Sequence, residues 1–287
     1  MPYDTAHFLQ PCSDLRDMAA TIAFIGGGNM AASLIGGLLA AGHPADALRV
    51  AEPLDARADW LRRTFGVRVE SAAAAVAQAD AVVLAVKPQQ MQGACAGLPL
   101  PAGCVVVSIA AGVQLASLQR WFGDRVHCVR TMPNTPALLR AGISGLYADP
   151  ATPATARQLA ETILSAAGSC VWLTSEAQLD AVTALSGSGP AYYFLLTEVL
   201  REAGTRLGLS PEVAAQLARQ TFIGAARMAE GDTDVVALRA HVTSKGGTTE
   251  AAVTHLEQAG IRTLFADALA AAAARSAELG AALSRES

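Results

Sequence analysis

The sequence predicts an α/β protein in which a doubly wound parallel sheet comes first and an all-α region follows. Up to about residue 174, short runs of β-branched and other apolar residues alternate with helix-length segments. Continuous apolar strands separated by helices are typical of a parallel sheet that is covered on both faces. A glycine cluster directly follows the first strand, and the strand pattern ends after residue 174. These observations predict two domains.

The elements follow from the chain in order. Six strands alternate with helices, and two more extend one edge of the sheet. The expected strands are 21–25, 48–52, 67–69, 81–86, 104–109, 126–130, 143–148 and 169–173. The helices expected after them are 176–186, 190–207, 211–230, 233–242, 248–259 and 261–283. Ser210, Pro211 and Glu212 form a typical helix start, with a hydroxyl at the N-cap, proline next and an acid in the first turn. We therefore expect a disordered tail over 1–20, a dinucleotide-binding domain over 21–174 and a helical domain over 175–287.

The amino-acid composition excludes several classes of function. The 287 residues are 52% hydrophobic and 16% charged, with a net charge of −4, which predicts a large core and further apolar surface buried against another subunit. The acidic balance argues against nucleic acid as a partner, and no apolar stretch is long enough for a membrane span. Five scattered cysteines without a CxxC pair predict no cysteine metal site and a reducing, cytoplasmic location.

The glycine cluster has the form G-x-G-x-x-A and lies between a strand and a helix, as in a Rossmann-type dinucleotide site. Gly26 permits the tight turn, Gly28 lets a pyrophosphate approach the backbone, and Ala31 packs the helix on the strand. Asn29 and Met30 open that helix, whose N-terminus favours phosphate. Glu52 ends the second strand, where an acid binds the ribose hydroxyls of NAD and repels a 2′-phosphate. Arg49 and Arg57 lie close in sequence, so the choice between NADH and NADPH stays open.

Further cofactor-binding candidates follow other strands, because ligands bind at the carboxyl ends of strands in open α/β sheets. They lie in segments whose small residues and prolines give a rigid backbone with room for a nicotinamide ring: Ala85, Val86, Lys87, Pro88, Ala110, Ala111 and Asn134.

The helical half contains a second anion site. Glycines and hydroxyl residues precede the helix expected over 248–259, where backbone N–H groups and the helix dipole favour a carboxylate or phosphate. The candidate substrate-binding residues are Ser244, Gly246, Gly247, Thr248 and Thr249. An ordinary N-cap needs one hydroxyl and no glycine pair, so an anion site is favoured over simple capping by Thr248.

From Thr21 to about Leu283 the chain resembles the pyrroline-5-carboxylate reductase family. The resemblance rests, in chain order, on GGGNMA, AVKP, SIAAG, RTMPNTPALLRAG, LSGSGPAYYF and VTSKGGTTEAAVTHLE. It implies a Rossmann domain followed by a helical dimerisation domain, active sites between two subunits, and homodimers that gather into larger rings such as decamers. It also implies NADPH or NADH as hydride donor, a small cyclic imine carboxylate as substrate and L-proline as product. Lys245 departs from the proline of many members, and Glu52 departs from the small or neutral residue of NADPH-preferring ones.

The roles that follow are hypotheses. A protonated imine is already electrophilic, so the enzyme needs mainly to hold it close to the nicotinamide and exclude water. The substrate carboxylate is expected at the second anion site, with the Thr249 hydroxyl at the ring nitrogen as the catalytic residue. Glu230 is a further candidate near the substrate, and Lys87 is the alternative proton donor. No metal is expected.

Two other functions stay open on the residues alone. The first is a β-hydroxyacid or 6-phosphogluconate-type dehydrogenase, whose substrate-facing lysine would be Lys245. The second is a non-catalytic NAD(P)-sensing protein, although a sensor needs no second anion pocket.

Overall fold

The computed structural model describes the chain over residues 20–286, with side chains described to residue 283. The expected tail, apart from Ala20, lies outside the described residues. The chain packs as two compact units. Unit 1 runs to Gly187 and also contains the chain from Ala273 onward, whereas unit 2 is Ser188–Ala272.

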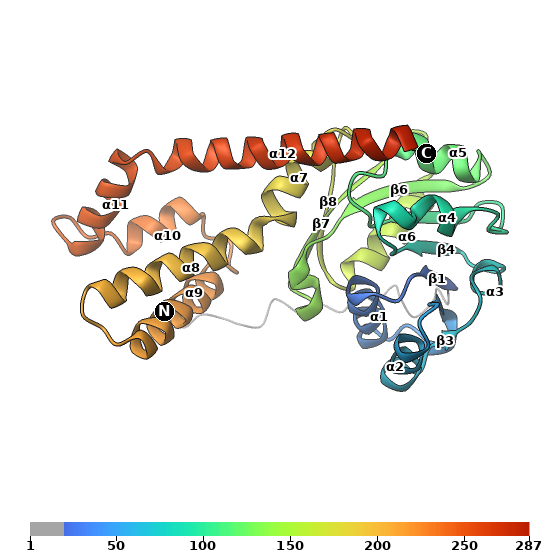
Figure 1. The fold of residues 1–287 in the computed structure, drawn as a ribbon, viewed down its shortest axis with the longest axis horizontal. Coiled ribbons are helices and arrows are strands. Elements are labelled where there is room, and N and C mark those ends of the chain that lie inside the picture. The colour runs from blue at the N-terminus through green and yellow to red at the C-terminus, as the bar shows by residue number, and fades with distance from the viewer. Residues whose placement is uncertain (1–19, 287) are drawn as a thin grey trace. The chain divides into compact units, whose positions relative to one another are not determined.

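Unit 1 is built on one eight-stranded sheet (Figure 1). Its strands are β1 (Ile22–Ile25), β2 (Leu48–Ala51), β3 (Arg68–Val69), β4 (Ala81–Leu84), β5 (Val105–Ser108), β6 (His127–Met132), β7 (Gly142–Ala148) and β8 (Gly168–Trp172). Their order is β3-β2-β1-β4-β5-β6-β7-β8. Neighbours pair in parallel except β6 and β7, which are antiparallel. The first six strands thus have the order of a dinucleotide-binding sheet, with the switch point between β1 and β4.

The sheet is covered on both faces because alternate residues of its central strands face opposite cores. Ile22 and Phe24 pack with α1 and α6, whereas Ala23 and Ile25 pack with α3, α4 and α5. The helices of unit 1 are α1 (Asn29–Ala40), α2 (Asp55–Phe65), α3 (Ala72–Val76), α4 (Met91–Cys95), α5 (Leu115–Phe122), α6 (Ala154–Ser165) and α7 (Gln178–Val182). A π-helical turn, Thr183–Gly187, extends α7.

Unit 2 is entirely helical. It consists of α8 (Gly189–Arg206), α9 (Pro211–Met228), α10 (Val235–His241), α11 (Thr248–Gln258) and the first part of α12 (Ile261–Glu286). The N-cap expected at Ser210 is present, since its Oγ accepts a hydrogen bond from the Val213 N–H at 3.3 Å. In Figure 1, α8 and α9 lie side by side, and the Tyr193 and Phe222 rings stack between them at 5.8 Å.

The predicted fold class is confirmed, and the element ends differ from expectation by a few residues. The strand expected over 81–86 ends at Leu84, because Ala85 and Val86 turn to pack against Gly26. The helix expected from 233 begins at Val235, because the Asp234 carboxylate accepts from the Val236 N–H and caps it. Across the described residues, none of the helices combines the length and apolar character that a membrane crossing requires.

Candidate active site

The loop between β1 and α1 has the backbone that a dinucleotide site requires. Gly26 has a φ of +97°, and a Cβ there would lie 2.8 Å from the Ala85 carbonyl oxygen, so only glycine fits. A Cβ on Gly28 would meet no protein atom within 4 Å. Gly28 caps α1 without a side-chain hydrogen bond, which leaves the N-terminus of α1 facing open space. Such a terminus binds phosphate groups.

The other loops expected to bind cofactor share this edge of the sheet, since they follow parallel strands. Ala85 and Val86, which follow β4, touch the Gly26 turn across the switch point. Lys87 is exposed, and Pro88 opens a short 3-10 turn. After β5, Ala110 is buried and Ala111 is exposed. The sheet therefore brings the candidate loops after β1, β4 and β5 together.

Glu52 lies against the glycine loop. One carboxylate oxygen accepts the Gly27 N–H at 2.9 Å, and the other accepts the Leu54 N–H at 2.9 Å. An acid at the end of β2 is where a ribose binds in this fold. Together, the open position at Gly28, the free helix terminus and this acid fit a nicotinamide dinucleotide.

Asn134 is committed to the protein's own backbone. Its amide oxygen accepts the Ile143 N–H at 2.9 Å, and its amide nitrogen donates to the Ser186 carbonyl at 3.2 Å. The side chain is 9% exposed. Asn134 thus ties the loop after β6 to β7 and to the π-helical turn, and its backbone is the part left to face a ligand.

The loop after β5 is held in place by contacts that no sequence pattern predicted. Glu176 accepts the Leu115 N–H at 2.7 Å and forms an ion pair with Arg130, whose side chain is 10% exposed. On the other side of the loop, Gly112 has a φ of +78° and approaches Gly280 of α12 so closely that a Cβ on either would be 3.2 Å from the other's backbone. The Ala110–Gly112 segment is therefore held from two sides within unit 1.

The second anion site that the sequence predicts corresponds to the loop before α11, in unit 2. Gly246 has a φ of +73°, and Gly247 caps α11 without a side-chain hydrogen bond. Within the described part of the chain, the N–H groups of Thr248 and Thr249 have no hydrogen-bond partner. Thr248 is exposed and is the first helical residue, so it is not a plain N-cap. The helix start thus offers free donors to an anion.

Glu250, in the first turn of α11, contacts this loop although no sequence pattern predicted it. Its carboxylate accepts the Gly246 N–H at 2.6 Å, while the Gly247 N–H donates to the Ser244 carbonyl at 3.0 Å. Two of the five expected substrate-binding residues therefore already have their N–H groups satisfied. An acid in the first turn of a helix, four residues after a glycine, is a local sequence signal from which this contact could have been predicted.

The remaining candidates in unit 2 are less constrained. Thr249 is half-buried, whereas Ser244 and Lys245 are exposed. Glu230 is exposed in the turn after α9, and its N–H donates to the Arg227 carbonyl. Over the described residues, no hydrogen bond or ion pair joins its side chain to the loop before α11.

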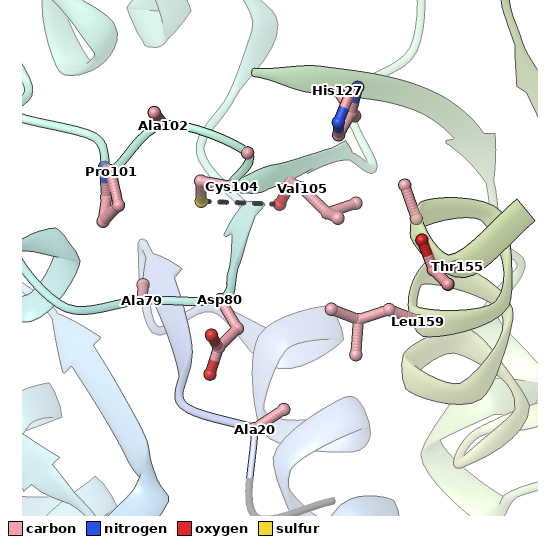
Figure 2. A pocket seen from close by; sticks show the side chains of 12 residues that line it. Ala20, Ala79, Asp80, Pro101, Ala102, Cys104, Val105, His127, Thr155 and Leu159 are labelled. Carbon is pink, nitrogen blue, oxygen red and sulfur yellow. Dashed lines mark hydrogen bonds between the residues drawn. The ribbon is translucent and has the colours of Figure 1, made fainter. Parts of the chain in front are cut away.

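A cavity of about 490 Å³ lies at the opposite edge of the sheet. Figure 2 shows Asp80, Cys104 and His127 along it, at the amino ends of β4, β5 and β6, with Thr155 and Leu159 of α6. Ligands in this fold bind at the carboxyl ends of strands, so this cavity is not the cofactor site. In the described part of the chain, no group of three or more histidine, cysteine or acidic side chains is arranged to hold a metal ion.

Comparison with known proteins gives matches over both parts of the chain. Residues 176–279 match the family model described as pyrroline-5-carboxylate reductase dimerisation, and residues 21–112 match that of the coenzyme F420-dependent NADP oxidoreductases. A pyrroline-5-carboxylate reductase of Pseudomonas aeruginosa is 52% identical over 90% of this chain and 96% of its own length. A pyrroline-5-carboxylate reductase of Mycobacterium tuberculosis is 41% identical over 91% of this chain and 97% of its own length.

Solved structures agree with these matches. A pyrroline-5-carboxylate reductase from Coxiella burnetii superposes with a TM-score of 0.87 at 43% identity, covering 91% of this chain and 99% of that one. The pyrroline carboxylate reductase of Plasmodium falciparum, solved with NADP bound, gives a TM-score of 0.75 at 26% identity. The match covers 91% of this chain and 98% of that one.

The sheet order, the glycine loop and the helical second unit define an NAD(P)-dependent oxidoreductase. Two relatives, 52% and 41% identical across nine tenths of the chain, identify the family within this class. The chain belongs to the pyrroline-5-carboxylate reductase family.

The expected family, its NAD(P)H-dependent reduction of a cyclic imine carboxylate to proline, and the reduced nicotinamide cofactor are thereby confirmed. The match to a dimerisation model supports an oligomer. The individual site residues and the domain limits stay predictions.

Proposed function

We propose that this chain reduces 1-pyrroline-5-carboxylate through two sets of residues, one in each unit. The dinucleotide is bound in unit 1 by Gly26, Gly28, Asn29, Met30 and Glu52, with the nicotinamide lined by Ala85, Val86, Lys87, Pro88, Ala110, Ala111 and the backbone of Asn134. When bound, it supplies the hydride that the imine carbon accepts. The open position at Gly28, together with the free N-terminus of α1, is the observation that supports this assignment most strongly.

The substrate carboxylate is assigned to the start of α11. The free N–H groups of Thr248 and Thr249 and the positive end of the helix dipole favour an anion there. The Ser244 hydroxyl and the N–H groups of Gly246 and Gly247 complete the proposed set. Because the Glu250 carboxylate accepts the Gly246 N–H and the Ser244 carbonyl accepts the Gly247 N–H, use of either donor requires that hydrogen bond to be exchanged for one to the substrate.

Thr249 is assigned to the ring nitrogen of the imine. A threonine hydroxyl is a weak acid, so its role is to orient the protonated nitrogen and to relay a proton from water. Glu230 stays a secondary substrate-binding candidate, since it lies on an exposed turn of the same unit.

Substitution of Thr249 by valine tests this assignment, because valine keeps the shape and removes the hydroxyl. We expect turnover of the imine to fall about 10²-fold, the lower range for loss of one proton-transfer group, while the Kd for reduced nicotinamide measured by calorimetry stays unchanged. Thr205→Val on α8 is the control, since its hydroxyl bonds its own helix at the Arg201 carbonyl. An unchanged turnover rate in Thr249→Val would remove Thr249 from the mechanism.

We further propose a homodimer as the functional unit and a cytoplasmic location, where reduced nicotinamide and free thiols persist. The dimer is supported by the match to a dimerisation model and by the apolar surface of unit 2. The decamer implied by the family resemblance is proposed as the larger assembly, and sedimentation velocity of the purified protein distinguishes the two masses.

A further inference from the structure

The ribose end of the proposed cofactor site is shaped by Glu52. Its two carboxylate oxygens accept the N–H groups of Gly27 and Leu54, each at 2.9 Å. The first contact joins the end of β2 to the glycine loop, and the second closes the turn that leads into α2. The carboxylate is therefore fixed beside the loop rather than free to swing into solvent.

The Glu52 carboxylate can still accept hydrogen bonds from hydroxyl groups. An ionised carboxylate offers about four acceptor positions, and two are used by the backbone. The 2′- and 3′-hydroxyls of an NADH ribose can donate to the other two. A 2′-phosphate carries about −1.5 to −2 charges and only acceptor oxygens, so it would meet a fixed negative charge without a hydrogen bond. Asp55, an exposed acid in the first turn of α2, adds to the negative charge.

Two arginines could reverse this preference by binding a 2′-phosphate, but each already contacts another part of the protein. Arg57 donates from Nε to the Gly27 carbonyl at 2.6 Å, and its guanidinium lies 4.1 Å from the centre of the Trp60 ring. Its Nη2 is buried and has no partner within the described residues, so a phosphate in solvent does not reach it without movement of the side chain. Arg49, on β2, forms an ion pair with Glu70, which follows β3, with 3.9 Å between Nε and Oε1. These two atoms are buried and make no hydrogen bond within the described residues, so a phosphate in solvent does not reach this Nε either.

We propose that this enzyme selects NADH over NADPH and that Glu52 is the residue that determines the selection. The inference rests on the proposed position of the dinucleotide at the Gly26–Gly28 loop. Arg57 supports the selection indirectly, because its bond to Gly27 helps to hold the loop against the carboxylate.

Calorimetric titration of the intact enzyme with NADH and with NADPH tests the selection without turnover. We expect the Kd for NADPH to exceed that for NADH by at least 10-fold. In Glu52→Gln, which keeps the shape and removes the charge, we expect the ratio of the two Kd values to fall about 10-fold. The ratio is the informative quantity, because a looser glycine loop would weaken both cofactors alike. Glu161→Gln, the same change at an acid of α6 whose carboxylate accepts the Trp172 Nε1–H at 2.8 Å, is the control and should leave the ratio unchanged.

The outcomes separate the inference from the function on which it rests. If the unaltered enzyme binds NADPH as tightly as NADH or more tightly, the proposed selection is wrong while the cofactor site stands. If neither dinucleotide binds, the cofactor site itself is wrong. A ratio that Glu52→Gln does not change would remove Glu52 as its determinant. The unaltered enzyme supplies the first two results even if the variant does not fold.

Discussion

The two units of this chain bury their apolar residues in opposite ways. Unit 1 encloses two cores, one on each face of its sheet, with residues such as Phe24, Leu34 and Val106 fully buried. In unit 2, Ala214 is the only fully buried apolar side chain among the described residues 188–272. Large apolar side chains of α8 and α9 are instead exposed: Tyr193, Phe194, Leu195, Leu196, Val199, Leu200 and Leu217. We call these seven residues the apolar set of unit 2.

This difference predicts that unit 1 completes its core within one chain, whereas unit 2 needs another subunit to cover its apolar residues. A sheet with helices on both faces completes its own core. Helices that leave so many large apolar side chains exposed to water are typical of an interface with another subunit. This agrees with the match to a dimerisation model. The division therefore predicts that substitutions in unit 1 alter unfolding and that substitutions in unit 2 alter assembly.

The largest effect is expected from a charge in the apolar set of unit 2. Phe194 and Leu200 are 63% and 51% exposed in the single chain. Replacing both with aspartate would bury two unpaired charges in a dimer, which costs several kcal/mol. We expect the dimer Kd to rise at least about 10³-fold, equivalent to about 4 kcal/mol, and imine reduction to be lost with it. Sedimentation across a range of protein concentrations measures the change.

The control for this pair is Leu139→Asp, at a leucine of unit 1 that is 82% exposed. It introduces one aspartate at an exposed position outside unit 2 and should leave the dimer intact. A double variant that stays dimeric and active would show that the exposed faces of α8 and α9 are not the interface.

The next effect concerns the four described cysteines, all of which lie in unit 1. Burial raises the pKa of Cys95, Cys104 and Cys128 to about 12 each. Since the thiolate is the reactive form, a shift of about three units predicts alkylation near pH 8 about 10³-fold slower than that of a free thiol. Rates with a maleimide measure this in a variant that carries both Cys12→Ser and Cys170→Ser, so that the three buried thiols alone remain, with and without urea. Rapid alkylation of the native variant would show that this interior is open to solvent.

The same shifts have a consequence for stability. A thiol whose pKa is raised in the folded state stays protonated there while the unfolded chain ionises, so its contribution is complete below about pH 9 and is lost as pH rises toward 12. We expect the urea midpoint to fall between pH 9 and 10.5. The Cys128→Ala variant should show a shallower fall, because one of the three groups is absent. An equal slope in both proteins would contradict the assignment.

Most of the fold follows from the sequence because it depends on local patterns. Strands such as 81–84 are short runs of apolar residues, and the start of α9 is encoded by Ser210 and Pro211 within one turn. The glycine loop was predictable for the same reason, since its G-x-G-x-x-A motif lies within six consecutive residues, although the close approach of the Ala85 carbonyl to Gly26 is a contact that the motif does not contain. Patterns of this kind require no knowledge of distant contacts.

The parts of the site that the sequence did not reveal depend on residues far apart in the chain. Glu176 reaches the Leu115 N–H across 61 positions, and Asn134 bonds Ser186 across 52. Neither contact leaves a periodic signal, because each is fixed by how β5, β6 and α7 pack. Asn134 was expected at the cofactor on its place after a strand, and only its burial reveals that its side chain serves the loop.

The smallest predicted effect tests how tightly the core of unit 1 is closed. Gly37 lies in the middle of α1, where alanine would ordinarily stabilise a helix by about 1 kcal/mol. A Cβ there would be 2.0 Å from the Ala166 carbonyl oxygen, so the overlap must be relieved by shifting α1 away from the end of α6. We expect Gly37→Ala to lower the free energy of unfolding by about 1–3 kcal/mol. Gly93→Ala on α4, where a Cβ would meet nothing within 4 Å, should raise it by a few tenths to about 1 kcal/mol. Because both are glycine-to-alanine changes in helices, opposite signs in urea unfolding would locate the cause in packing, and equal signs would mean that the contact between α1 and α6 is looser than the structure has it.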